Sequence, residues 1–168
     1  MITLSLNEIR DHGPCKSGWE TLLKYKKDTH WNEQFPLSDI IDSNGFSDTL
    51  WCLRVRPEHS NLWRKYAVWC ARQVEHLMTD NRSKSALDVA WRHSEGVATD
   101  QELAAARDAA AAAAWDAAAL AAEAAASDTA WDAAWLAAGD TAWDAAWDAA
   151  GAAQEKKLRE ILKAGEWR

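Results

Sequence analysis

The chain has 168 residues, enough for one domain, and a formal net charge of −7. No apolar run reaches the ~18 residues that a membrane-spanning helix needs, so we expect no membrane segment. The three cysteines, Cys15, Cys52 and Cys70, follow no metal-binding or disulfide-framework spacing, which favours a reducing cytoplasm. The negative net charge also disfavours direct binding of nucleic acid.

The excess negative charge lies in the second half of the sequence. Residues 1–98 contain 13 acidic and 13 basic side chains, whereas residues 99–168 contain 13 acidic and 6 basic ones. From Asp108 to Glu155 there are nine carboxylates and no lysine or arginine. A block of like charge is most often a solvated helix face, so this acidic tract is expected to keep an alanine-rich segment in solution.

Short helices separated by turn residues are expected in the first half, because no stretch shows the alternation of a strand. We therefore predict no sheet. The expected N-terminal caps of the two central helices are Ser38 and either Ser47 or Asp48. The predicted helices of this half cover residues 4–11, 16–27, 36–45, 49–56, 60–80 and 82–96.

The helix predicted over residues 60–80 has the clearest amphipathic pattern of the first half. Within it, Arg72 and His76 are four residues apart and share a face, with Gln73 beside them. These three side chains are expected either to form a polar contact surface or to hold a neighbouring loop in a buried network, the commoner arrangement. The apolar stripe of this helix consists of Leu62, Tyr66, Trp69, Cys70, Val74 and Leu77.

The second half begins with the strongest helix signal in the chain. Thr99 and Glu102 have the spacing of a capping box, and the residues that follow are mostly alanine, the best helix former. A helix is therefore predicted over residues 100–126. A shorter amphipathic helix is predicted over residues 154–167, with basic residues near its C-terminus.

Between these helices, residues 127–150 contain two copies of a twelve-residue repeat, SDTAWDAAWLAA and GDTAWDAAWDAA. Trp and Asp recur every four residues, and a stripe with this period drifts by about 40° per step around an α-helix. We therefore expect helical segments broken near Ser127, Gly139 and Gly151, with the Trp side chains packed in a core. Packing on the chain's own N-terminal half and packing in a homodimer both stay open.

The carboxylates of the repeat are the candidate partner-binding groups. A carboxylate at every fourth helical position recurs about every 6 Å, comparable to the phosphates along one nucleic-acid strand. Such a face suits a basic surface on a protein partner, with Trp side chains as anchors. The candidate contact residues are Asp132, Asp140, Asp144, Asp148, Trp143 and Trp147.

Enzymatic motifs are missing from the sequence. There is no dinucleotide-binding, P-loop, serine-hydrolase or zinc-protease signature. His12 and Cys15 flank a Gly-Pro turn, where such a pair more often marks a packed corner than a nucleophile with its base. We predict no catalytic residues, no metal ligands and no cofactor.

The segments that carry a resemblance to known proteins are PCKSGWETLL, LWCLR, the stretch from Trp69 to Asp108 and AAQEKKLREIL. Through them the chain resembles a family of bacterial and prophage immunity proteins of the Imm5-like type. The resemblance implies a small all-helical protein that binds and neutralises a toxin in the bacterial cytoplasm. Where a phage carries such a protein, the same binding would act in the infected host. The family supplies no catalytic motif to transfer.

These observations predict an all-α fold over residues 1–168, with the acidic repeat half packed against short N-terminal helices. The predicted function is non-enzymatic inhibition of a protein partner by occlusion, as in an immunity protein that binds a toxin. Two alternatives stay open. One is phage-encoded anti-defence inhibition, of the anti-CRISPR type, in which the acidic face mimics nucleic acid and so inhibits a host defence complex. The other is a module whose Trp side chains stack on a small ligand such as a nucleotide.

Overall fold

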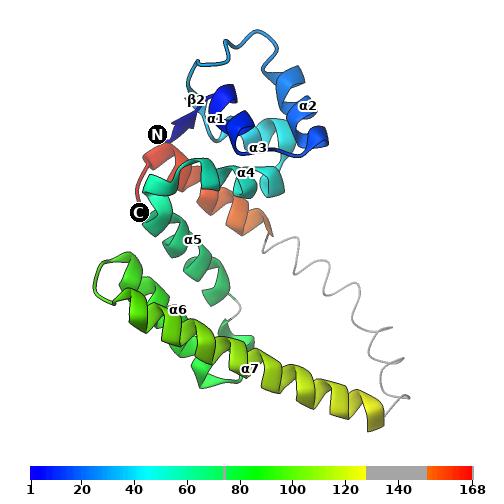
Figure 1. Ribbon diagram of the computed structural model, residues 1–168, viewed down its shortest axis with the longest axis vertical. Coiled ribbons are helices and arrows are strands. Elements are labelled where there is room, and N and C mark those ends of the chain that lie inside the picture. The colour runs from blue at the N-terminus through cyan, green and yellow to red at the C-terminus, as the bar shows by residue number, and fades with distance from the viewer. Residues whose placement is uncertain (74, 128–150, 168) are drawn as a thin grey trace. The chain divides into compact units, whose positions relative to one another are not determined.

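A computed structural model describes residues 1–73, 75–127 and 151–167, and it confirms the all-α fold class (Figure 1). Side chains are described for these residues except Leu77 and residues 114–127. No helix in the described ranges is long and apolar enough to cross a membrane.

The chain divides into two compact units. The first comprises Met1–Trp63 together with Glu155–Arg168, and the second comprises Arg64–Gln154. This division differs from the change in charge at residue 98, because the C-terminal residues belong with the N-terminal ones. The single domain expected over residues 1–168 stays a prediction.

The first unit consists of short helices, 3-10 turns and two strands of two residues each (Figure 1). Ser5 begins the first helix with a capping box, in which its hydroxyl accepts from Glu8 N and its own N–H donates to the Glu8 carboxylate. From residue 151 to 164 the chain is again helical. The elements are β1 (Thr3–Leu4), α1 (Leu6–Asp11), α2 (Lys16–Tyr25), β2 (Phe35–Pro36), α3 (Asp39–Asn44), α4 (Phe46–Cys52) and the 3-10 turns η1 (Leu53–Val55) and η2 (Pro57–His59).

Aliphatic side chains from both ends of the chain form the core of this unit. The backbone joins the same segments, because Ile2 N–H donates to the Leu162 carbonyl at 2.9 Å and the Ile2 carbonyl accepts from Leu37 N at 3.0 Å. The C-terminal helix therefore completes the core that the N-terminal helices begin. Its fully buried aliphatic members are Leu4, Leu6, Ile9, Leu37, Ile40, Leu158, Ile161 and Leu162.

Two sequence predictions for this unit are wrong in detail. β1 and β2 form a small antiparallel pair, with Thr3 opposite Pro36 and Leu4 opposite Phe35, where no sheet was expected. Strands of two residues are too short to show alternation in sequence.

The caps of the two central helices also differ from the expectation. Ser38 precedes α3 without a side-chain capping hydrogen bond. α4 starts after Gly45, whose φ of 86° lies in the left-handed region, and not after Ser47 or Asp48. Asp48 instead accepts a hydrogen bond from Asn44 Nδ2 at 2.8 Å. A glycine turn thus replaces the polar cap predicted for α4, while Ser38 occupies the predicted cap position of α3 without the capping bond.

The second unit contains α5 (Ser60–Arg72) from Arg64 onward, the 3-10 turn η3 (Glu75–Leu77), α6 (Asn81–Ser94) and α7 (Asp100–Ser127). The helix predicted over residues 60–80 is therefore too long. Gln73 N–H donates to the Cys70 carbonyl, an i−3 bond that tightens the last turn. The sequence has no glycine or proline at this point, and the last residue of the helix, Arg72, contacts Asp88 of α6.

A buried tyrosine holds the middle of α5. Tyr66 is 4% exposed, and its hydroxyl donates to the backbone carbonyl of Gln154 at 2.9 Å. Burial raises the pKa of this phenol above its usual range, so the hydroxyl keeps its proton.

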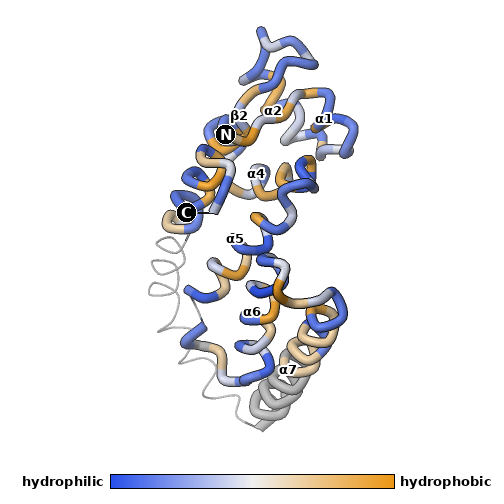
Figure 2. The backbone as a smooth tube through the Cα atoms, turned by 90° about the vertical axis from the view of Figure 1, so that its left-hand side faces the viewer, coloured by the Kyte–Doolittle hydropathy of each residue, from blue (hydrophilic) through white to orange (hydrophobic). Residues whose placement is uncertain are grey.

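α6 and α7 form a helical hairpin and contact each other. The predicted capping box of α7 is confirmed, because Glu102 N donates to Thr99 Oγ1 at 3.2 Å and Thr99 N donates to Glu102 Oε2 at 2.7 Å. Figure 2 shows the described part of α7 mostly in pale orange with scattered blue residues, as expected of an alanine-rich helix with isolated charges. α7 extends to Ser127, the last residue before the undescribed range. Gly139 lies inside that range, and Gly151 is the first described residue after it and is helical.

Candidate functional site

The predicted partner-binding residues lie outside the described ranges. The structure therefore places none of them, and their role rests on the charge pattern of the sequence. These residues are Asp132, Asp140, Asp144, Asp148, Trp143 and Trp147.

Arg72, Gln73 and His76 do not form one network in the structure. Arg72 Nη2 donates to Asp88 Oδ1 of α6 at 2.6 Å. Gln73 Nε2 donates to the Trp69 carbonyl of its own helix at 3.1 Å, and the exposed His76 belongs to η3. The shared helix face predicted for Arg72 and His76 is lost because α5 ends at Arg72. Arg72 therefore joins α5 to α6. Because all three side chains are exposed, they do not form a buried network, and their role as a polar contact surface stays a prediction.

The contact between α5 and α6 is built around one indole ring. The Lys65 ammonium lies 5.3 Å and the Arg72 guanidinium 5.6 Å from the ring centre of Trp91. Cations at such distances are attracted by the electron-rich face of an indole. Basic side chains of α5 thus pack on an aromatic side chain of α6.

A chain of polar contacts joins α5 to the start of α7. Arg64 Nη1 lies 2.9 Å from His93 Nδ1, and His93 Nε2 lies 2.7 Å from Asp100 Oδ1. Because a guanidinium only donates hydrogen bonds, His93 Nδ1 is the acceptor and Nε2 carries the proton that reaches Asp100. This arrangement fixes the tautomer of His93, and the Asp100 carboxylate accepts the hydrogen bond from His93 Nε2.

Other basic side chains of the second unit are paired in the same way. The ion pairs join Lys65 to Glu95 at 3.3 Å, Arg82 to Asp80 at 2.7 Å and Arg92 to Glu102 at 3.6 Å. All of these acids precede Asp108, as do Asp88 and Asp100 in the contacts above. These bases therefore neutralise acids outside the acidic tract of residues 108–155.

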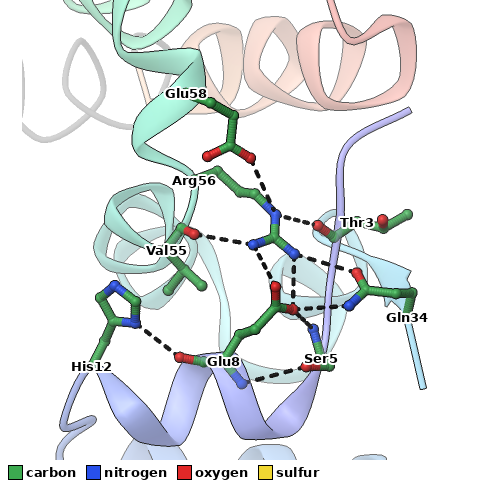
Figure 3. A network of polar contacts seen from close by, with 8 residues as sticks. All are labelled: Thr3, Ser5, Glu8, His12, Gln34, Val55, Arg56 and Glu58. Atoms are coloured by element: carbon green, nitrogen blue, oxygen red, sulfur yellow. Dashed lines mark hydrogen bonds and ion pairs between the residues drawn. The ribbon is translucent and has the colours of Figure 1, made fainter. Parts of the chain in front are cut away.

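In the first unit, Arg56 is the centre of a polar network (Figure 3). Its Nη2 donates to Glu8 Oε2 at 2.8 Å, and its Nη1 lies 2.8 Å from Glu8 Oε1, so the pair is bidentate. Arg56 Nε also donates to the Thr3 carbonyl at 2.6 Å, and Gln34 Nε2 donates to Glu8 Oε2 at 2.9 Å. The network ties β1, α1, the loop before β2 and the segment between η1 and η2 to one another.

The Glu8 carboxylate is held in its charged form by this network. The hydrogen bond from Arg56 is the main cause, and bonds from Gln34 and Ser5 add to it, so the pKa of Glu8 falls from 4.5 to about 2. The Arg56 side chain is only 14% exposed, so removing its partner would leave a largely buried cation. These features indicate a structural role.

The corner formed by His12, Gly13, Pro14 and Cys15 joins α1 to α2. His12 Nδ1 lies 2.8 Å from the Glu8 carbonyl at the end of α1. Cys15 Sγ accepts from Gly18 N at 3.4 Å and caps α2. Each side chain thus completes the end of a different helix, but His12 and Cys15 are both exposed, so the corner is not packed as expected.

Behind this corner lies a cavity of about 80 Å³ between α1, α2, α3 and α4. Its walls include the indoles of Trp19 and Trp51, with Leu22 and the thiol of Cys52 among the apolar groups and Asp48 among the polar ones. This pocket was not predicted from the sequence. Its residues come from four helices whose packing cannot be predicted from one sequence, although His12 and Cys15 marked the corner in front of it.

In the part of the chain that the structure describes, no three His, Cys, Asp or Glu side chains are grouped to hold a metal ion. Comparison of the chain with protein-family models, with curated proteins and with solved structures gives no match.

Proposed function

We propose that this chain is a non-enzymatic inhibitor that binds a protein partner and occludes its working surface, as an immunity protein does. The acidic tract of residues 108–155 would face a basic surface on that partner. Electrostatic complementarity of this kind raises the association rate and favours the right partner over others.

The observation that carries the proposal is the one-sided charge of the tract, and the pairing of bases in the second unit accompanies it. Arg72, Arg82, Arg92 and Lys65 form ion pairs with acids outside the tract. The tract itself contributes nine carboxylates and no lysine or arginine. Within the tract, Glu155 pairs with Arg159 of the C-terminal helix at 3.0 Å. A basic protein surface would match the other carboxylates of the tract. The resemblance to immunity proteins points to the same kind of partner.

The test compares three forms of the full chain as baits in lysates of bacteria, with and without phage infection. The first is the wild type. The second changes Asp132, Asp140, Asp144 and Asp148 to Asn. The third, a charge-matched control, removes four exposed acids of the first unit through Asp11→Asn, Glu20→Gln, Asp28→Asn and Glu33→Gln.

We expect a basic protein to be retained by the wild type and the control, to be lost from the tract variant, and to elute as salt rises. Equal retention by all three forms would rule out the acidic tract as the contact. The identity of the retained protein separates two versions of the proposal. A single toxin domain makes the chain an immunity protein, whereas a nucleic-acid-handling defence complex makes it an anti-defence inhibitor.

A further inference from the structure

The cavity in the first unit has walls from four helices. Ile9 of α1, Leu22 of α2, Ile40 of α3 and Cys52 of α4 are each at most 4% exposed and form its floor. Cys15 also lines the cavity and is exposed. Other lining residues, Trp19, Asp48 and Trp51 among them, are partly exposed, so the cavity lies at the surface with Cys15 on its rim.

Hydrogen bonds within the protein hold the polar side of the cavity in place. Asn44 Nδ2 donates to the Gly18 carbonyl and to Asp48 Oδ2, both at 2.8 Å, and Asn44 Oδ1 accepts from Ser43 Oγ at 2.7 Å. A Cβ on Gly18 would lie 2.7 Å from Asp48 Oδ2, so this glycine allows α2 to approach α4. The polar side chains of the cavity are thus already bonded to one another before any ligand enters.

The rest of the lining is apolar and uncharged. Trp19 and Trp51 offer two indoles, and Trp19 is itself supported by an edge-to-face contact with Trp31 at 5.9 Å. Burial, and then the nearby Asp48 charge, raise the pKa of the Cys52 thiol to about 12, so this thiol is neutral at physiological pH. The Asp48 carboxylate would repel a negatively charged ligand. An uncharged ligand would make mainly dispersion contacts with the lining.

Size limits the ligand further. An engineered apolar cavity of about 150 Å³ accepts benzene, and the present cavity measures about 80 Å³ with an outlet beside Cys15. A single ring fits only if its edge occupies the outlet. A nucleotide exceeds this volume and carries the charge that Asp48 opposes.

We propose that this pocket binds a small, uncharged, apolar molecule of at most one aromatic ring, seated between Trp19 and Trp51 with its edge at the Cys15 thiol. This binding site is separate from the acidic tract and does not depend on the function proposed for it. It also differs in ligand class from the nucleotide module that the Trp repeat suggested.

The experiment titrates the full chain with fluorobenzene and follows the ligand by ¹⁹F NMR, with 4-fluorobenzoate as a charged ligand of similar shape. We expect fluorobenzene to bind at least about tenfold more tightly than the benzoate. In parallel, alkylation of each cysteine by iodoacetamide is followed by peptide mass spectrometry. Bound fluorobenzene should slow the reaction of Cys15 and leave that of Cys70, which does not line the pocket, unchanged.

Two variants fill the pocket from opposite sides. Cys15→Phe changes an exposed position at the outlet, and Cys52→Leu adds bulk at the floor. Each should weaken fluorobenzene binding by about tenfold or more, while Cys70→Ser should not. If Cys52→Leu does not fold, Cys15→Phe and the wild-type alkylation rates decide. The proposal is overturned if fluorobenzene does not bind, if the benzoate binds equally well, or if folded Cys15→Phe binds like the wild type.

Discussion

Each of the two units of this chain is stabilised internally by a different kind of contact. In the first, leucine and isoleucine side chains from both ends of the chain are almost completely buried. In the second, the buried hydrophobic side chains among the described residues are Tyr66, Val68, Ala98 and Ala113, and charged and aromatic contacts join α5 to α6 and α7.

The difference shows how composition controls the source of stability. Burying a leucine or isoleucine stabilises a fold by about 1.5–3 kcal/mol, whereas alanine has little side chain to bury. An alanine-rich helix gains more from its intrinsic propensity and its cap. We therefore expect substitutions of apolar side chains to affect the first unit most, and changes of charge to matter relatively more in the second.

The largest effect is expected from Leu158→Ala in the first unit. Leu158 is 0% exposed, and its truncation should lower the free energy of unfolding by about 2–5 kcal/mol, because the fold cannot fully close the resulting cavity. The matched change in the second unit is Leu103→Ala in α7, a partly exposed position that should lose about 1 kcal/mol or less. Urea unfolding followed by circular dichroism measures both. Equal losses would contradict the contrast between the units.

A smaller, pH-dependent effect is expected at Glu8. Because its pKa falls from 4.5 unfolded to about 2 folded, its charge stabilises the fold above pH 4.5, and this stabilisation disappears as the pH falls toward 2. Glu8→Gln should therefore lose about 1 kcal/mol at pH 7, a figure already reduced for the solvent exposure of this carboxylate, and progressively less below pH 4.5. Unfolding measured from pH 7 to pH 2 tests this, with the exposed Glu20→Gln as the control. A loss independent of pH would show that the ion pair is not its cause.

The smallest effect is expected at the link between α5 and α6. Asp88→Asn removes the charge that faces Arg72, and since both side chains are more than a third exposed, the loss should be about 0.2–1 kcal/mol. The effect should shrink in 1 M salt, where screening extends over only ~3 Å. Amide hydrogen exchange in α5 and α6 reports it, with Asp28→Asn in the first unit as the control. A loss as large at high salt would mean that packing, and not charge, holds this contact.

The helices were predictable where local signals decide them. The Thr99 and Glu102 capping box and the alanines after it define α7 without tertiary help. The end of α5 was not predictable, because contacts such as Arg72 with Asp88 and Trp91 connect residues distant in sequence. The same holds for the pairing of β1 with β2, for the Glu8 and Arg56 network, and for the pocket. The candidate contact residues of the acidic repeat stay a prediction from charge pattern.

The salt dependence of partner binding tests the central claim most directly. The dissociation constant of the captured partner is measured across a range of salt concentrations for the wild type, the variant with four Asp changed to Asn, and the charge-matched control. If the acidic tract is the contact, binding of the wild type and the control weakens steeply with salt, and the tract variant binds weakly with a much flatter dependence. The same affinity and the same slope for all three forms would contradict the account.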